Sequence, residues 1–117
     1  MSTHPNVILL LTLTPDGLAR KTYRAIVGAN ADPDDAALEI GGERYNVRVM
    51  EDDYDDGFQI SAKEGDIIIF DYVTYGYGEK IAWDKLEAQK VALEAWAKEA
   101  AERHHCTYTI SVTANYW

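Results

Sequence analysis

One segment, residues 84–104, has the periodicity of an amphipathic α-helix, and the rest of the chain consists mainly of shorter β-type segments. Asp84 and Glu87 have the spacing of a capping box, in which two side chains satisfy backbone N–H groups of the first turn. We therefore expect one long helix that begins at Asp84 and ends near His104. Its apolar positions recur at helical spacing, which predicts a single buried face. These positions are Leu86, Leu93, Trp96, Ala97 and Ala100.

The exposed faces of this helix carry opposite charges four residues apart, a spacing that permits ion pairs along a helix. The pairs are Lys90–Glu94, Glu94–Lys98 and Glu99–Arg103.

Segments rich in aliphatic, β-branched and aromatic residues lie before and after the helix. The first, residues 6–13, ends at the turn sequence Thr-Pro-Asp-Gly of residues 14–17. We expect residues 18–27 to return as the second strand of a hairpin, with Arg20, Lys21 and Arg24 facing water, and residues 30–37 to form a loop. The remaining strands are expected at 45–50, 58–62, 66–75 and 107–113. Residues 66–75 are apolar on both faces, which predicts the central strand of the sheet.

This order of segments predicts an α+β fold in one domain, residues 1–117. It consists of a mostly antiparallel sheet of about five or six strands, with the helix packed on one face and a C-terminal closing strand. A single cysteine, Cys106, excludes an internal disulfide and is typical of a reducing compartment. The apolar run of residues 7–11 is too short to span a membrane and lacks the features of a signal peptide. We therefore expect a cytoplasmic protein that does not bind membranes.

The middle third of the chain is strongly acidic. Between Asp32 and Asp71 there are thirteen acidic residues and three basic ones, a formal charge of −10 in a chain whose total is −9. Carboxylates at this density repel one another and destabilise the compact state, which suggests a role outside the fold. The alternative is a solvated loop that keeps the protein soluble. With a pI near 4.6, the chain should avoid nucleic acid and anionic membranes, and a partner bound through charge should be basic.

Three groupings raise the possibility of metal binding or catalysis. Residues 52–63 resemble a calcium loop only in part, because the third and twelfth positions are Tyr54 and Lys63 instead of oxygen ligands. His104, His105 and Cys106 include zinc-type ligands, but no second pair at ligand spacing exists. Asp66 and Asp71 could act as a general acid or base on a central strand, or pair with an arginine. We expect no catalytic residue, no metal and no cofactor, and keep a small enzyme or metal-binding protein that uses Asp66 and Asp71 as an alternative.

Aromatic residues accompany the acidic ones, and tyrosine and tryptophan are enriched where proteins bind one another. We predict a partner-binding surface made of acidic and aromatic side chains, with Tyr72 and Trp96 assigned to the core instead. Its members are Asp32, Asp34, Asp35, Glu51, Asp52, Asp53, Tyr54, Asp55, Asp56, Tyr75, Tyr77 and Trp117.

In size, charge and expected architecture, the whole chain resembles the small acidic inhibitors made by phages, which include anti-CRISPR proteins and other DNA mimics. In an extended segment, alternate carboxylates recur about every 6.6 Å, so such a row could occupy a channel that normally holds nucleic-acid phosphates. The first hypothesis is therefore a non-catalytic inhibitor of a basic, nucleic-acid-binding partner, most concretely an anti-CRISPR protein. The second is an immunity protein that neutralises a basic nuclease toxin. The resemblance transfers no functional residue.

Overall fold

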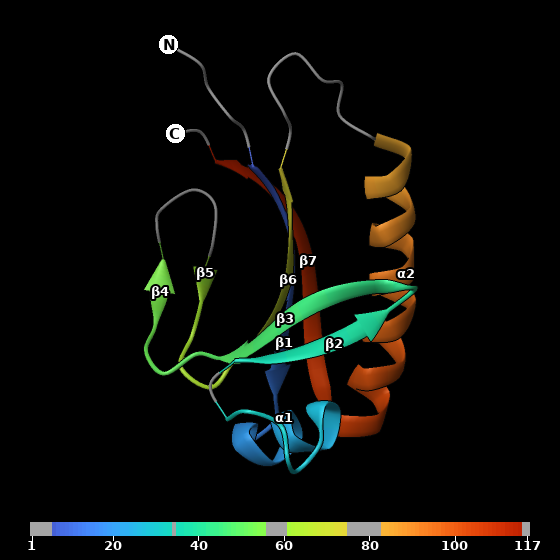
Figure 1. The fold of residues 1–117 in the computed structure, drawn as a ribbon. Coiled ribbons are helices and arrows are strands. Elements are labelled where there is room, and N and C mark those ends of the chain that lie inside the picture. Colours follow the sequence, from blue (N-terminus) through green and yellow to red (C-terminus); the bar gives the residue numbers. More distant parts are fainter. Residues whose placement is uncertain (1–5, 34, 56–60, 75–82, 116–117) are drawn as a thin grey trace.

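The structure of the chain is a computed structural model that describes residues 6–33, 35–55, 61–74 and 83–115 (Figure 1). Strands hold more residues of this part than helices do, and the longer of two helices precedes the last strand. The elements are β1 (Asn6–Pro15), α1 (Ala19–Val27), β2 (Ala36–Ile40), β3 (Glu43–Val49), β4 (Tyr54–Asp55), β5 (Ser61–Ala62), β6 (Ile67–Thr74), α2 (Trp83–His104) and β7 (Cys106–Asn115).

Five strands form one sheet in the order β2-β3-β6-β1-β7, in which every neighbouring pair is antiparallel. β6 occupies the central position, as its apolar residues on both faces predicted. β7 closes the sheet by pairing with β1 along its whole length, from Asn6 opposite Asn115 to Pro15 opposite Cys106. These features confirm the α+β class, the antiparallel sheet and the closing strand.

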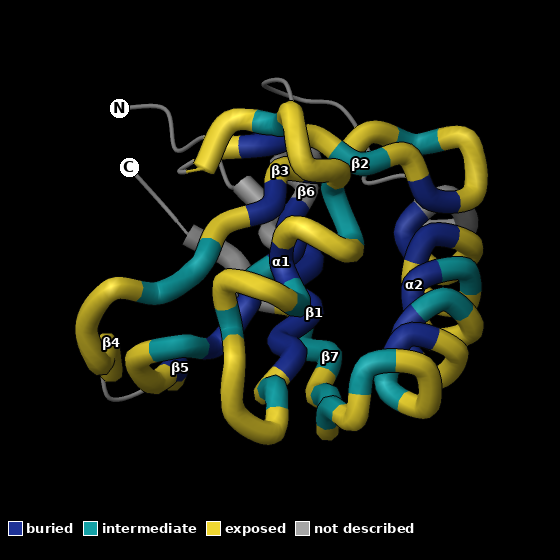
Figure 2. The backbone as a smooth tube through the Cα atoms, turned by 90° about the horizontal axis from the view of Figure 1, so that it is seen from below, coloured by how far each residue is buried: buried dark blue, intermediate teal, exposed yellow. Residues whose placement is uncertain are grey.

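α2 covers one face of the sheet and encloses the main core with it (Figures 1 and 2). Leu93 and Ala97 are fully buried in this core together with Leu9, Leu11 and Leu13 of β1. The predicted buried face is confirmed for Leu86, Leu93, Ala97 and Ala100. Trp96 is only partly buried and packs against the same core.

The ends of α2 differ slightly from the prediction. The helix begins at Trp83, so Asp84 lies inside the first turn and is not the N-cap residue of a capping box. It ends at His104, and His105, with a φ of 54°, reverses the chain into β7. Of the three expected ion pairs, Glu99–Arg103 forms at 2.9 Å. The exposed side chains of Lys90, Glu94 and Lys98 make no ion pair within the described part of the chain.

The hairpin expected over residues 18–27 is wrong, because this segment forms the helix α1. Its apolar residues Tyr23, Ile26 and Val27 follow helical spacing and turn toward the core, where Tyr23 is fully buried. The Tyr23 hydroxyl donates a hydrogen bond of 2.6 Å to the Asp32 carbonyl oxygen. β1 finds its antiparallel partners in β6 and β7 instead.

The turn between β2 and β3 packs directly against α2. Gly41 has a φ of +60°, and a Cβ atom placed there would lie 2.8 Å from the Cβ of Ala92. A glycine is therefore needed at this position both for the backbone conformation and for the close approach.

The second face of the sheet carries a smaller cluster in which Leu10 and Phe70 are buried and Ile68 packs against them. The Arg48 guanidinium lies 5.8 Å from the centroid of the Phe70 ring. On this side of the molecule, opposite α2, the chain leaves the main sheet after β3 and forms the separate pair β4 and β5 (Figure 2). We call the described residues of this excursion, 51–55 and 61–65, the acidic arm.

Candidate partner-binding surface

The acidic arm is anchored at its base and exposed along its first strand. The Met50 N–H donates to the Asp66 carbonyl oxygen at 2.8 Å, and the Gly65 N–H donates to the Met50 carbonyl oxygen at 2.9 Å. Beyond this base, residues 51–55 are all exposed, and Tyr54 is 50% exposed. β4 then pairs with β5, with Tyr54 opposite Ala62 and Asp55 opposite Ser61. Of the strand expected over 58–62, residues 58–60 lie outside the described part.

Two aspartates of this region hold the arm in shape. Asp53 Oδ1 accepts a hydrogen bond of 2.8 Å from the Glu64 backbone N–H, which ties the two sides of the arm together. Asp66 is 6% exposed, and its Oδ2 accepts a hydrogen bond of 3.0 Å from the Lys63 N–H. The Asp66 N–H in turn donates to the Lys63 carbonyl oxygen at 2.9 Å, which closes a tight turn over residues 63–66. These contacts give Asp66 a structural role in the turn before β6.

A second acidic segment lies between α1 and β2. The Asp35 N–H donates to Asp32 Oδ1 at 3.2 Å, so Asp32 shapes its own loop, and both side chains are exposed. The loop expected over 30–37 is present at its start, but β2 already begins at Ala36. Asp34 lies outside the described residues.

Two arginines contact the acidic segments and bring them into one region of the surface. Arg20 of α1 donates to the Pro33 carbonyl oxygen at 3.1 Å, and its guanidinium lies 3.7 Å from the Glu51 carboxylate. Arg48 of β3 lies 3.7 Å from the Asp35 carboxylate. All four charged groups are largely exposed, so each ion pair contributes at most about 1 kcal/mol. Their main effect is to lower the local negative charge near α1.

An open cleft of about 560 Å³ separates α1 from the base of the arm. Arg20, Lys21 and Arg24 line one wall, and Glu51 and Glu64 line the other. Leu18, Val49 and Met50 add an apolar surface. Sequence reasoning placed the three basic residues in water but on a strand, and it therefore missed that they lie on a helix beside this cleft, with Arg20 in contact with the arm.

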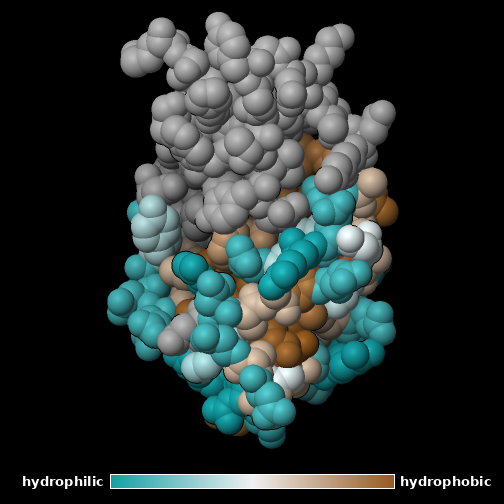
Figure 3. Space-filling model, viewed as in Figure 1, coloured by the Kyte–Doolittle hydropathy of each residue, from teal (hydrophilic) through white to brown (hydrophobic). Residues whose placement is uncertain are grey.

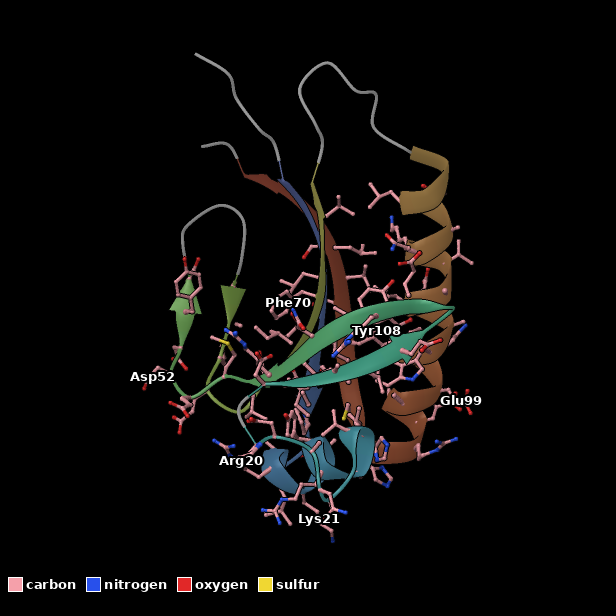
Figure 4. All side chains as sticks on the ribbon, viewed as in Figure 1. Arg20, Lys21, Asp52, Phe70, Glu99 and Tyr108 are labelled. Carbon is pink, nitrogen blue, oxygen red and sulfur yellow. The ribbon has the colours of Figure 1, made fainter. Side chains whose placement is uncertain are left out.

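One uncompensated carboxylate of the arm is Asp52. It is exposed and has no hydrogen-bond or ion-pair partner among the residues that the structure describes. Figure 4 shows Asp52 at the outer bend of the arm, with Arg20 and Lys21 on α1 below it. On the face seen in Figure 3, hydrophilic residues cover much of the described surface. Asp52 thus places an uncompensated negative charge at the outer bend of the arm, two residues before Tyr54.

The structure therefore assembles only part of the predicted surface. Arg20 joins Glu51 to Pro33, in the loop that holds Asp32 and Asp35, and Asp52, Asp53, Tyr54 and Asp55 are displayed on one arm. Asp56, Tyr75, Tyr77 and Trp117 lie outside the described residues, as does the side chain of Tyr72. The backbone of Asp71 pairs with Leu9 within the sheet, and its side chain is likewise outside the description.

The histidine and cysteine residues at the end of α2 form a turn into β7. The Cys106 thiol donates to the His104 carbonyl oxygen at 3.6 Å. Burial raises the pKa of the Cys106 thiol above its ordinary value, which disfavours the reactive thiolate. Within the described ranges, no three His, Cys, Asp or Glu side chains are grouped so that they could hold a metal ion.

The chain matches no protein-family model, no curated protein and no solved structure. In the described part, neither helix is both long and apolar enough to cross a membrane.

Proposed function

We propose that this protein is a non-catalytic inhibitor that blocks a basic, nucleic-acid-binding partner, with the acidic arm placed where the partner would hold nucleic acid. One observation carries the proposal. The half-exposed Tyr54 ring sits among the exposed side chains of Glu51, Asp52, Asp53 and Asp55, on an arm that does not pair with the main sheet. An aromatic ring within a carboxylate row combines an apolar anchor with long-range attraction to cations.

The arrangement supports mimicry of a nucleic-acid strand. Alternate side chains along an extended segment are about 6.6 Å apart, and the arm presents exposed carboxylates on both sides of Tyr54 in the short strand β4. The Asp53 contact with the Glu64 N–H fixes the arm before binding, so less conformational entropy is lost when a partner is engaged. The most concrete version is an anti-CRISPR protein, whose partner would be a Lys- and Arg-lined effector complex.

Displacement of DNA from purified CRISPR effector complexes tests this proposal. A fluorescently labelled target duplex is bound to each complex, and its anisotropy is followed as the protein is added at several salt concentrations. We expect displacement that weakens steeply as salt rises, because steering charges act through screened fields. The same titration on basic nuclease domains covers the immunity-protein alternative.

Matched charge variants test whether the acidic arm is the part of the protein that binds the partner. Glu51→Gln with Asp52→Asn removes two charges from the arm and should slow association by about tenfold. The control, Asp16→Asn with Glu102→Gln, removes two exposed charges elsewhere and should leave association nearly unchanged. Equal effects from both variants, or displacement that does not respond to salt, would contradict mimicry and favour solubility as the role of the acidic segment. Inhibition of a nuclease domain without DNA displacement would favour the immunity protein.

A further inference from the structure

β7 is an edge strand with unusual composition for this chain. It pairs with β1 on one side, and no other described strand pairs with it. Its ten residues, CTYTISVTAN, include no charged residue and no proline. Natural edge strands are usually short or carry charges, prolines or bulges that prevent pairing with another chain. The opposite edge follows this rule, because β2 has five residues with Glu39 among them and Asp35 just before it.

The surface of β7 is open enough to receive another strand. α2 packs over β7 and β1 on the core face, and Val112 of β7 is 43% exposed. Thr107 and Thr109 are also exposed. Threonine, valine and isoleucine favour strand pairing, so the edge combines free backbone groups with side chains that pair well.

We propose that two copies of this chain associate through β7, antiparallel about a twofold axis perpendicular to the sheet. The two five-stranded sheets then become one sheet of ten strands. Side chains alternate between the faces of a strand. If both cores are to lie on the same face, directly opposite residues must therefore both have odd numbers or both have even numbers. One residue of β7 therefore lies opposite itself on the axis, and both α2 helices lie on the same face.

The flank of α2 next to this edge is self-complementary in charge. Its other flank is occupied, because Ala92 contacts the β2–β3 turn and Trp96 and Arg103 line a small pocket with Leu38 of β2. At 100° per residue, the flank directed away from β2, toward the β7 edge, carries exposed charged residues. These are Glu87, Lys90, Glu94 and Lys98.

Two antiparallel copies of this flank place each acidic residue opposite a lysine. Lys90 faces Glu94 of the second copy, and Glu87 faces Lys98 of the second copy. None of these four side chains has an ion-pair partner within the described part of its own chain. Two negatively charged proteins repel each other in general, so a neutral edge flanked by a balanced set of charges favours a second copy over a charged foreign strand.

The charge pairs of α2 and the length of β7 give the same position for the twofold axis, measured from the turn that joins the two elements. The charge pairs are symmetric about residue 92, which lies about 18 Å along α2 from its end at His104, at 1.5 Å per residue. His105 joins this end to β7, and about 17 Å along β7 from Cys106, at 3.4 Å per residue, the chain reaches Ser111. Ser111 is therefore the residue that lies opposite itself.

Cysteine cross-linking tests the register. Opposite Cα atoms of an antiparallel pair are about 4.5–5.5 Å apart, within the range for a disulfide. In a Cys106→Ser background, Ser111→Cys should form a covalent dimer under mild oxidation. Thr107→Cys is the control, because its two copies would lie roughly 27 Å apart and should remain monomeric on a non-reducing gel. Equal cross-linking of both variants, or of neither, would overturn the register.

Charge exchange tests the association itself, measured by sedimentation with circular dichroism as the check on folding. Lys90→Glu with Lys98→Glu makes the flank wholly acidic, and Glu87→Lys with Glu94→Lys makes it wholly basic. Each variant alone should dimerise at least about tenfold more weakly than the parent, because four ion pairs become repulsive. An equimolar mixture should regain the parent's association. The proposal would be overturned by a parent that sediments as a monomer at millimolar concentration, or by a mixture that dimerises no more strongly than its components. Neither result tests the role of the acidic arm, so the two proposals can fail separately.

Discussion

Arg20 and Glu51 form an ion pair of 3.7 Å that joins α1 to the base of the acidic arm. Arg20 also donates to the Pro33 carbonyl oxygen, so one side chain contacts both acidic segments. Arg20 lies on α1 (Ala19–Val27), so this contact depends on a helix where the sequence pattern predicted a strand. It reduces the negative potential on one side of the arm and leaves the outer side, with Asp52, uncompensated.

Arg20→Gln is expected to have opposite consequences for stability and binding. Loss of an exposed ion pair should change the free energy of unfolding by less than about 1 kcal/mol. Removal of a cation beside the arm should speed association with a basic partner, since the steering field becomes more negative. Urea denaturation and surface plasmon resonance measure the two effects. Slower association would mean that Arg20 contacts the partner itself.

Leu93→Ala is expected to destabilise the protein by about 2–5 kcal/mol, the range for a large-to-small change in a packed core. Leu93 is fully buried between α2 and the sheet. Val91 lies on the same helix but is 62% exposed, so Val91→Ala should change stability by no more than about 0.5 kcal/mol. Urea denaturation of both variants gives the comparison. Equal stabilities would show that α2 docks through another face.

Gly41→Ala is expected to destabilise the β2–β3 turn by about 1–3 kcal/mol through overpacking, because the new methyl group would lie 2.8 Å from the Ala92 Cβ. Gly42→Ala is the control, since Gly42 also has a positive φ, of +83°, but has open space around it. Adding Ala92→Gly to Gly41→Ala should recover part of the loss. Thermal denaturation of the double variant is compared with that of Ala92→Gly alone, which itself costs about 1 kcal/mol in a helix interior. No recovery in that comparison would show that backbone strain accounts for the effect.

The sequence predicted those elements whose periodicity agrees with their final environment. Residues 66–75 are apolar on both faces because β6 is central in the sheet, and the apolar positions of α2 coincide with its buried face. α1 was misassigned because its nine residues are few for a helical period and include the β-branched Thr22, Ile26 and Val27. Tertiary burial of Tyr23 outweighs that local preference.

The candidate surface was predictable in composition but not in arrangement. A count of carboxylates locates the acidic segment, whereas the contacts of Arg20 with Glu51 and of Arg48 with Asp35 depend on which elements meet in space. The same applies to Asp53 and Asp66, whose hydrogen bonds to backbone N–H groups make them structural. A pattern of side chains along the chain contains no information on these roles.

Cys106 provides a prediction for pH dependence. Burial raises the pKa of its thiol in the folded protein, so the thiol of the unfolded chain ionises first as the pH rises. The stability that this difference contributes is complete below the thiol pKa of the unfolded chain, and it is lost as the pH rises through the folded pKa. Unfolding free energies of the parent and Cys106→Ser, measured from neutral to alkaline pH, should therefore differ in slope. A chromogenic disulfide reagent should also react more slowly with the folded protein than with the unfolded chain, and equal rates would contradict a partly buried thiol of raised pKa.

Tyr54 should affect binding to a basic partner differently from the carboxylates around it. If its ring is desolvated in the complex, Tyr54→Ala removes an anchor and should raise the dissociation rate, by roughly thirtyfold for a loss of about 2 kcal/mol. Association should hardly change, because the charge of the arm is unaltered. Tyr54→Phe keeps the ring and should dissociate at nearly the parent rate unless the hydroxyl is bonded to the partner. Asp52→Asn should show the reverse pattern, with slower association and little change in dissociation. Stopped-flow and surface plasmon resonance measurements at matched salt separate the two rates. A Tyr54→Ala variant that dissociates like the parent would place the binding contacts outside the arm.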